Sequence, residues 1–176
     1  MVTNQIWKVF SQACLGQYES GITLLVQIRT EALNKQWIQT WIEASSHLGK
    51  IHYLAGNTET ALQILDEVRQ KATPLGFAGA GTGYAYVQAK SALQQGDHKL
   101  AIENGLFILE KAKNESSLWL EWLALDILLA AEMDGGENIA NYKAQLKNVV
   151  RNLNQSKPHW MDFDLNSKKP SLFGLV

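Results

Sequence analysis

Apolar residues along the chain recur at steps of three and four residues on both sides of short turns. After the turn Gly56-Asn57, the apolar positions are Ala61, Ile64, Leu65, Val68 and Ala72. This spacing places them on one face of a helix, whereas a strand would alternate at every second residue. The segment 41–53 before the turn has the same spacing, so a helix is predicted on each side rather than a β-hairpin. Gly56 is predicted to end the first helix in the left-handed conformation, and Asn57 to be the N-cap of the second.

The same turn recurs every forty residues. It is found at Gly16-Gln17, Gly56-Asn57, Gly96-Asp97 and Gly136-Glu137, and five residues beyond the glycines lie Gly21, Ala61, Ala101 and Asn141. The apolar register of the following helices also repeats, in Leu25 with Leu65, Ile28 with Val68 and Ile108, and Ala32 with Ala72 and Ala112. A repeat of this length is typical of a solenoid, in which each unit buries its apolar face against its neighbours. We therefore expect an all-α fold, an α-α superhelix of about four antiparallel helical hairpins with no sheet.

Composition agrees with one helical domain followed by a tail. The 176 residues are 46% hydrophobic, which is enough for one contiguous core, and the three prolines lie outside the periodic segments. The repeat domain is predicted over residues 1–155. Residues 156–176 have no helical period but are rich in apolar side chains, so we expect them to pack on the last hairpin as a cap.

Neither an export signal nor a membrane span is predicted. The N-terminal segment lacks a basic start followed by an apolar run. The most apolar stretch, 118–131, is interrupted by Glu121 and Asp126 and is too short to cross a bilayer, so a buried helix is predicted there. The single cysteine excludes an internal disulfide. Together these features predict a cytoplasmic protein, or a cytoplasmic piece of a larger one.

The net charge of −1 hides an uneven distribution. Residues 97–137 contain nine acidic residues and three lysines, whereas residues 138–176 contain six basic and two acidic residues. Solvated helix faces and a soluble tail explain this pattern. Nucleic-acid binding is not predicted, because no basic stripe with interleaved aromatic residues runs through the repeats.

The segment 47–74 resembles a tetratricopeptide repeat. That pattern asks for Leu-Gly in the first helix, a small residue early in the second and a closing proline, which are supplied by Leu48, Gly49, Ala61 and, one residue late, Pro74. The match is looser elsewhere, and the period of forty exceeds the usual thirty-four. It is more similar to the longer-helix variant in regulatory regions of bacterial signalling proteins, such as MalT-like regulators. Over residues 3–153 the resemblance implies a right-handed superhelix whose concave face binds partners.

Motifs that would indicate catalysis are few. The glycines of segment 76–84 suggest a phosphate loop, but no strand precedes them and no Gly-Lys-Ser/Thr follows, so a loop between hairpins is predicted. His47 and His52 are five residues apart, whereas two metal ligands on one helix are usually four apart. No second potential metal ligand lies at a suitable spacing from Cys14. Three potential ligands lie together in the tail, His159, Asp162 and Asp164, but such a cluster is usually a solvated turn. We predict a protein that is not an enzyme and needs no cofactor or metal.

Tryptophan is abundant, with six residues. Trp7, Trp37 and Trp41 are placed near the starts of first helices, and Trp119 and Trp122 begin the fourth hairpin. Packing between adjacent repeats would bury them. An exposed Trp37 or Trp119 would instead mark a protein-binding or dimer surface.

The first helix of each predicted hairpin is expected to line the concave surface. The predicted partner-binding groove consists of Lys50, Tyr53, Tyr86, Lys90, Leu93 and Gln94. Lys50 and Lys90 are one repeat apart and are expected to lie side by side, where they would suit a carboxylate or another anionic group on a partner. Glu43 and Asp126 would oppose such a site. Two solvated lysines are the alternative interpretation.

Two classes of function fit these predictions. The first is a non-catalytic scaffold or adaptor that binds a protein or peptide partner in the concave groove. The alternative is a ligand-sensing regulatory domain of a bacterial signalling protein, in which a ligand changes the curvature of the solenoid. Neither nucleic acid nor membrane is expected as a partner.

Overall fold

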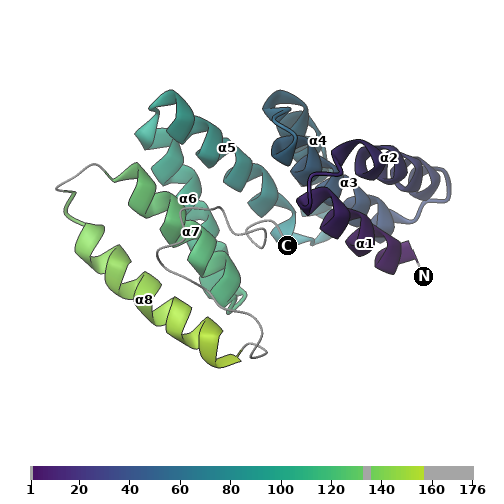
Figure 1. The fold of residues 1–176 in the computed structure, drawn as a ribbon. Coiled ribbons are helices and arrows are strands. Elements are labelled where there is room, and N and C mark those ends of the chain that lie inside the picture. The colour runs from purple at the N-terminus through teal and green to yellow at the C-terminus, as the bar shows by residue number, and fades with distance from the viewer. Residues whose placement is uncertain (1, 133–135, 157–176) are drawn as a thin grey trace. The chain divides into compact units, whose positions relative to one another are not determined.

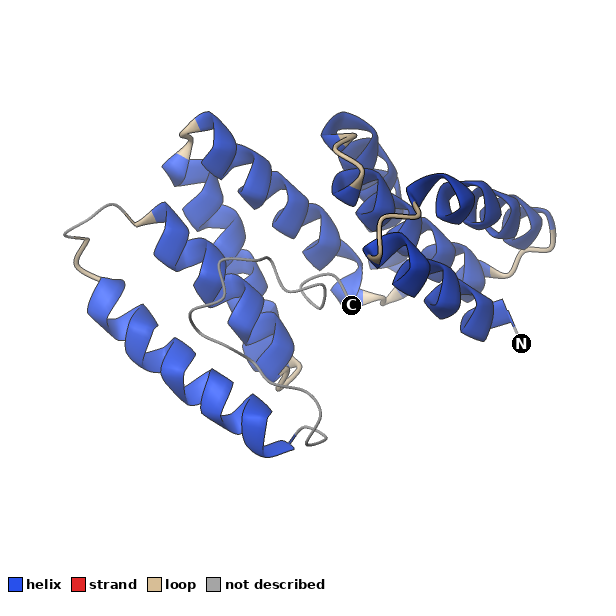
Figure 2. Cartoon of the chain, in the orientation of Figure 1, coloured by secondary structure: helices blue, strands red, loops and turns tan. Residues whose placement is uncertain are grey.

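A computed structural model describes residues 2–132 and 136–156 of the chain (Figure 1). These residues form helices and loops without any strand (Figure 2), so the prediction of an all-α fold is confirmed. The α-helices are α1 (Val2–Cys14), α2 (Tyr18–Asn34), α3 (Ile38–Leu54), α4 (Thr58–Ala72), α5 (Thr82–Gln95), α6 (His98–Asn114), α7 (Leu118–Ala131) and α8 (Ile139–Ser156). Two short 3₁₀ helices, η1 (Thr73–Leu75) and η2 (Ala78–Gly81), connect α4 to α5. Beyond Ser156, the predicted capping tail lies outside the described residues.

The chain divides into two compact units, Met1–Val87 and Gln88–Val176, with the boundary inside α5. In the first unit, α1, α2, α3 and α4 pack against one another in chain order, and α1 also contacts α3. In the second unit α7 packs between α6 and α8. Helices therefore pack against their sequence neighbours, as the repeat predicts.

The core of the first unit is built around α3. Its side chains Trp41, Ala44, Leu48 and Ile51 are almost completely inaccessible to solvent. The predicted apolar faces of the second helices are buried as expected: Gly21, Leu25, Ile28 and Ala32 on α2, and Ala61, Leu65, Val68 and Ala72 on α4. α3 is thus covered on several sides, which explains why it contains more buried residues than either neighbour.

The second unit repeats this arrangement. α6 buries Ala101, Gly105, Ile108, Leu109 and Ala112. The apolar stretch 118–131 is the helix α7, and six of its fourteen residues are buried, so the prediction of a buried helix there is confirmed. Among the described residues, no helix combines the length and apolar character needed to cross a bilayer.

The turns between helices share one backbone motif that recurs every twenty residues, half the predicted period. A left-handed residue stands at Gly16, Gln36, Gly56, Gly76, Gly96 and Ser116. In each turn the N–H of this residue is bonded to the carbonyl three residues earlier, and the next N–H is bonded to the carbonyl five residues before itself. This pair of bonds is the Schellman motif, which satisfies carbonyls at a helix end. The left-handed conformation predicted for Gly56 is therefore confirmed.

One detail of the predicted turns differs in the structure, and one predicted turn borders residues that are not described. Asn57 is the N-cap residue of α4, but its side chain makes no capping hydrogen bond, whereas the side chain of Asp97 accepts one from the N–H of Leu100. The turn predicted at Gly136-Glu137 stays a prediction, because residues 133–135 just before it lie outside the described residues. The connection that contains Gly136 is longer than the turns at Gly16, Gly56 and Gly96, since α7 ends at Ala131 and α8 begins at Ile139.

Candidate functional site

Three of the predicted groove residues, Lys50, Tyr53 and Tyr86, lie in the first unit, and Tyr86 is buried. The rings of Tyr53 on α3 and Tyr86 on α5 meet edge to face, with centroids 6.4 Å apart and planes at 84°. Lys50 lies one helical turn before Tyr53, and its Nζ is 5.8 Å from the centre of the Phe10 ring on α1. The helices α1, α3 and α5 therefore supply the Phe10, Tyr53 and Tyr86 rings in this part of the first unit, and a partner-binding groove there stays a prediction.

The other three groove residues lie in the second unit. The Nζ of Lys90 is 3.2 Å from a carboxylate oxygen of Asp126 on α7. The sequence predicts that Asp126 would oppose an anion-binding site here. The ion pair does so, because it offsets the charge of Lys90. Leu93 is half-buried and Gln94 is exposed. Because Lys50 and Lys90 belong to different units, their side-by-side placement stays a prediction.

Burial of the neighbouring His47 shapes the electrostatics around Lys50. The His47 ring contacts the rings of Trp7 and Phe10, with centroids 4.8 and 4.7 Å away. Burial, together with the charge of Lys50, lowers the pKa of His47 to about 3, so this imidazole is neutral at physiological pH. Burial also raises the pKa of the Tyr53 hydroxyl. His47 and Tyr53, two neighbours of Lys50 on α3, are therefore uncharged at neutral pH.

A second candidate surface lies at the turns that follow α2 and α4. We define the end patch as five apolar residues that are 36–57% exposed: Leu33, Trp37, Ile38, Leu75 and Phe77. The N–H of Trp37 is bonded to the Ala32 carbonyl, and the N–H of Phe77 to the Ala72 carbonyl. Both alanines belong to one core cluster with Trp41 and Val68. The two turns are therefore anchored on the same cluster, which places them at one end of the first unit.

Aromatic residues at this turn position are specific to the end patch. In the other four Schellman turns the residue after the left-handed one is polar: Gln17, Asn57, Asp97 and Ser117. In the end patch it is Trp37 or Phe77, forty residues apart. Trp37 is 45% exposed. The sequence predicts that an exposed Trp37 would mark a protein-binding or dimer surface. The ammonium group of Lys35 lies 4.6 Å from the centre of the Trp37 ring and is paired with Glu31.

The remaining tryptophans divide between core and surface. Trp41 is buried, whereas Trp7 is 39% exposed although it contacts His47. Trp119 and Trp122 stack on each other with centroids 5.1 Å apart and are half-buried. Burial between helices is predicted for these four tryptophans and for Trp37. Of the five, only Trp41 is fully buried.

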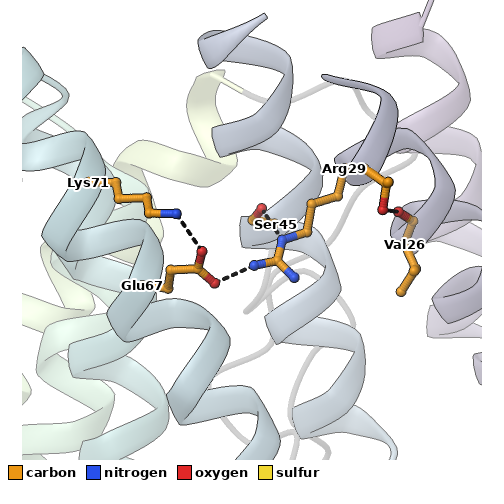
Figure 3. Close-up of polar contacts among 6 residues, drawn as sticks. Val26, Arg29, Ser45, Glu67 and Lys71 are labelled. Carbon is orange, nitrogen blue, oxygen red and sulfur yellow. Dashed lines mark hydrogen bonds and ion pairs between the residues drawn. The ribbon is translucent and has the colours of Figure 1, made fainter. Parts of the chain in front are cut away.

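A polar network that the sequence analysis missed joins three helices of the first unit (Figure 3). Arg29 on α2 donates from Nε to the Ser45 hydroxyl on α3 at 3.0 Å, and it forms an ion pair with Glu67 on α4. Lys71 pairs with the same carboxylate at 2.7 Å. The spacing of Glu67 and Lys71, four residues apart on one helix, is the only part of this network that sequence indicates.

The network covers the buried indole of Trp41. The Arg29 guanidinium lies 5.7 Å and the Lys71 ammonium 4.9 Å from the centre of its ring. Burial alone would raise the pKa of Glu67, but hydrogen bonds and charge from Lys71 and Arg29 outweigh it and lower that pKa. Every charge in the network has a partner within it. We therefore assign it a structural role in joining α2, α3 and α4.

Candidate metal ligands do not converge in the part of the chain that is described. No group of three or more His, Cys, Asp or Glu side chains is placed to hold an ion there. The cluster of His159, Asp162 and Asp164 lies outside the described residues, as does the side chain of Cys14. The glycines of segment 76–84 belong to a Schellman turn, to η2 and to the start of α5. This is the loop between hairpins that the sequence analysis predicts.

Comparison with known proteins adds no relative. No family model, no curated protein and no solved structure matches the chain.

Proposed function

We propose that this protein is a cytoplasmic, non-catalytic scaffold of the tetratricopeptide-repeat type that binds a segment of a partner protein. The observation that carries the proposal is the end patch, where five large apolar side chains are exposed at one end of the first unit. Large apolar residues gathered on a surface are typical of interaction sites. Tryptophan in particular often anchors protein interfaces.

The surroundings of the end patch favour an apolar partner surface. The nearby cations Lys35 and Lys71 are already paired, with Glu31 and Glu67 on their own helices. A partner therefore gains little from charge here, since exposed pairs contribute weakly and would have to be broken. Burial of the Trp37 and Phe77 rings supplies the free energy instead. We propose the apolar face of an amphipathic helix as the occupant.

The aromatic surroundings of Lys50 provide a second place for partner binding within the same function. In the first unit Lys50 lies beside the Phe10 ring, and Tyr53, one turn later on α3, contacts the Tyr86 ring. We keep the proposal that this group receives an anionic side chain or terminus of a partner by charge-assisted hydrogen bonding. The contribution of Lys90 is reduced by its pairing with Asp126.

Site-specific photo-cross-linking tests the role of the end patch. A photoreactive phenylalanine analogue replaces Phe77 in one form of the protein and Phe107, which is similarly exposed at 38% on α6, in a control form. In the native host, the form labelled at position 77 is expected to give a discrete adduct with a second protein. The additional change Trp37→Gln should remove that adduct, whereas Val26→Gln, at another exposed apolar residue, should retain it.

Three outcomes would contradict the proposal. Equal adducts from positions 77 and 107 would show that the end patch is not a specific site. An adduct that survives Trp37→Gln would show that the patch does not hold the partner. An adduct between two copies of this chain, together with a dimer in sedimentation of the purified protein, would make the end patch a self-association surface instead.

A further inference from the structure

The exposed face of α8 is basic and contains no acidic residue. Lys143, Lys147 and Arg151 follow one another at intervals of four residues, so they lie on one side of the helix over about 12 Å of its length. All three side chains are exposed. Tyr142, Val149 and Val150 are buried, and α8 packs on α7.

These three cations lack the ion pairs that the cations of α4 have. On α4, Arg69 is bonded to Asp66 and Lys71 to Glu67. On α8, the described residues provide no ion pair for Lys143, Lys147 or Arg151, and Arg151 donates a hydrogen bond to Oδ1 of Asn148 at 3.2 Å. Like charges four residues apart repel each other on a helix. The folded helix therefore holds a row of positive charge that no carboxylate among the described residues compensates.

The shape and composition of this face restrict what it can bind. An open hollow of about 470 Å³ lies along its second half, lined by Lys147, Asn148, Val150, Arg151, Asn154 and Gln155. Its polar groups are ammonium, guanidinium and amide groups. They provide many hydrogen-bond donors, which suit carboxylates.

We propose that the basic face of α8, formed by Lys143, Lys147 and Arg151, binds an acidic segment of a partner protein. Successive cations are spaced by about 6 Å along the axis, which is also the spacing of carboxylates four residues apart on a partner helix. Three charge-assisted contacts in register would remove the repulsion along α8. This surface lies on the second unit and does not depend on the end patch.

Two other anionic partners fit the face less well. Nucleic-acid binding from three cations alone would be weak at physiological salt, and the exposed residues of α8 include no aromatic ring on which a base could stack. An anionic membrane is also less suitable, because the exposed residues of α8 are Ala, Asn, Gln, Lys and Arg, none of which inserts into lipid.

The test uses two synthetic helical peptides that differ only in charge. One has glutamate at three positions four residues apart, and the other has glutamine at the same positions. Fluorescence anisotropy measures their binding to the full chain. The glutamate peptide is expected to bind at least about tenfold more tightly than the glutamine peptide, with binding that weakens as salt rises from about 50 mM to about 300 mM.

Two triple variants assign the binding to α8. Lys143→Gln, Lys147→Gln and Arg151→Gln together should reduce binding of the glutamate peptide to that of the glutamine peptide. The control combines Lys8→Gln, Lys99→Gln and Lys113→Gln, exposed lysines on α1 and α6, so that the net charge changes equally. The control should bind like the unchanged protein. Circular dichroism should show equal helicity for all three proteins, because glutamine is a good helix former.

Several results would overturn the inference. Equal binding of both peptides would exclude an acidic segment as the ligand, and equal loss in both triple variants would show that only net charge matters. Tighter binding of a short DNA duplex, or of vesicles containing phosphatidylserine, than of the glutamate peptide at physiological salt would assign the face to that partner instead.

Discussion

Gly49 on α3 and Leu65 on α4 approach so closely that a side chain on the glycine would collide with the leucine. A Cβ atom at Gly49 would lie 2.6 Å from Cγ of Leu65. Both residues are fully buried, and Leu65 belongs to the apolar face that repeats along the second helices. The hairpin formed by α3 and α4 therefore depends on the absence of a side chain at one position.

Gly49→Ala should destabilise the protein by about 1–3 kcal/mol, the usual cost of overpacking a core. This is opposite to the gain of up to about 1 kcal/mol that alanine gives over glycine inside an exposed helix. Urea unfolding followed by circular dichroism measures the change. The matched control is Gly83→Ala on α5, where the nearest atom, Cδ2 of Leu65, is 3.4 Å from the added Cβ. The control should be neutral or slightly stabilising, and equal effects at both positions would contradict the prediction.

Buried His47 should make stability fall on mild acidification. Its pKa is about 3 in the folded protein and close to 6.5 when unfolded, so between these values the unfolded chain binds more protons. The stabilisation is complete above about pH 6.5 and is lost as the pH falls toward 3. At about pH 5 the expected loss is roughly 2 kcal/mol, because one pKa unit corresponds to about 1.4 kcal/mol.

Urea unfolding of the unchanged protein and of His47→Leu at about pH 7.5 and about pH 5 measures this contribution. The unchanged protein should lose stability between the two pH values, and the variant should lose much less. The contribution of Glu67 falls in a different window: its pKa is lowered in the folded state, so its stabilisation is present above about 4.5 and lost only below that value. If both proteins lose the same amount between pH 7.5 and 5, His47 is not the group responsible.

Gln36 and Ser116 should be suboptimal residues for the turns they occupy. Both have positive φ, 58° and 52°, a conformation in which a Cβ atom is strained and glycine is not. Gln36→Gly and Ser116→Gly should each raise the free energy of unfolding by about 0.5–1 kcal/mol, after the greater flexibility of glycine in the unfolded chain is subtracted. Thermal unfolding detects such a gain.

The matched control for this pair is Gln17→Gly. Gln17 is the residue after Gly16 in the first Schellman turn and has a φ of −89°, so glycine relieves no strain there. The control should lower stability through the flexibility of the unfolded chain. A gain at position 17 equal to the gains at 36 and 116 would show that the left-handed conformation is not the cause.

Local periodicity determined much of the fold of this protein. The apolar faces of α2, α4 and α6 follow from steps of three and four residues, because the helix repeat depends only on the backbone of the segment itself. The left-handed turn at Gly56 was predictable for the same reason, since the steric advantage of glycine acts within one residue. Gln36 and Ser116 adopt the same conformation without that signal, so the turns at these two positions escaped prediction.

Tertiary packing decided which of the predicted side chains are available for binding. Lys90 is a candidate for the groove by its register, but its ion pair with Asp126 brings together residues 36 positions apart on two different helices. The contacts of Arg29 with Ser45 and Glu67 also depend on how three helices pack. Trp41 and Trp37 are four residues apart, yet only Trp41 is buried. Trp41 packs against Ala32 of α2 and Ala72 of α4, whereas Trp37 lies in the turn after α2 and is 45% exposed. The exposure of a side chain and the ion pairs it forms depend on residues far away in the sequence. A local pattern does not show which of these residues come close in space.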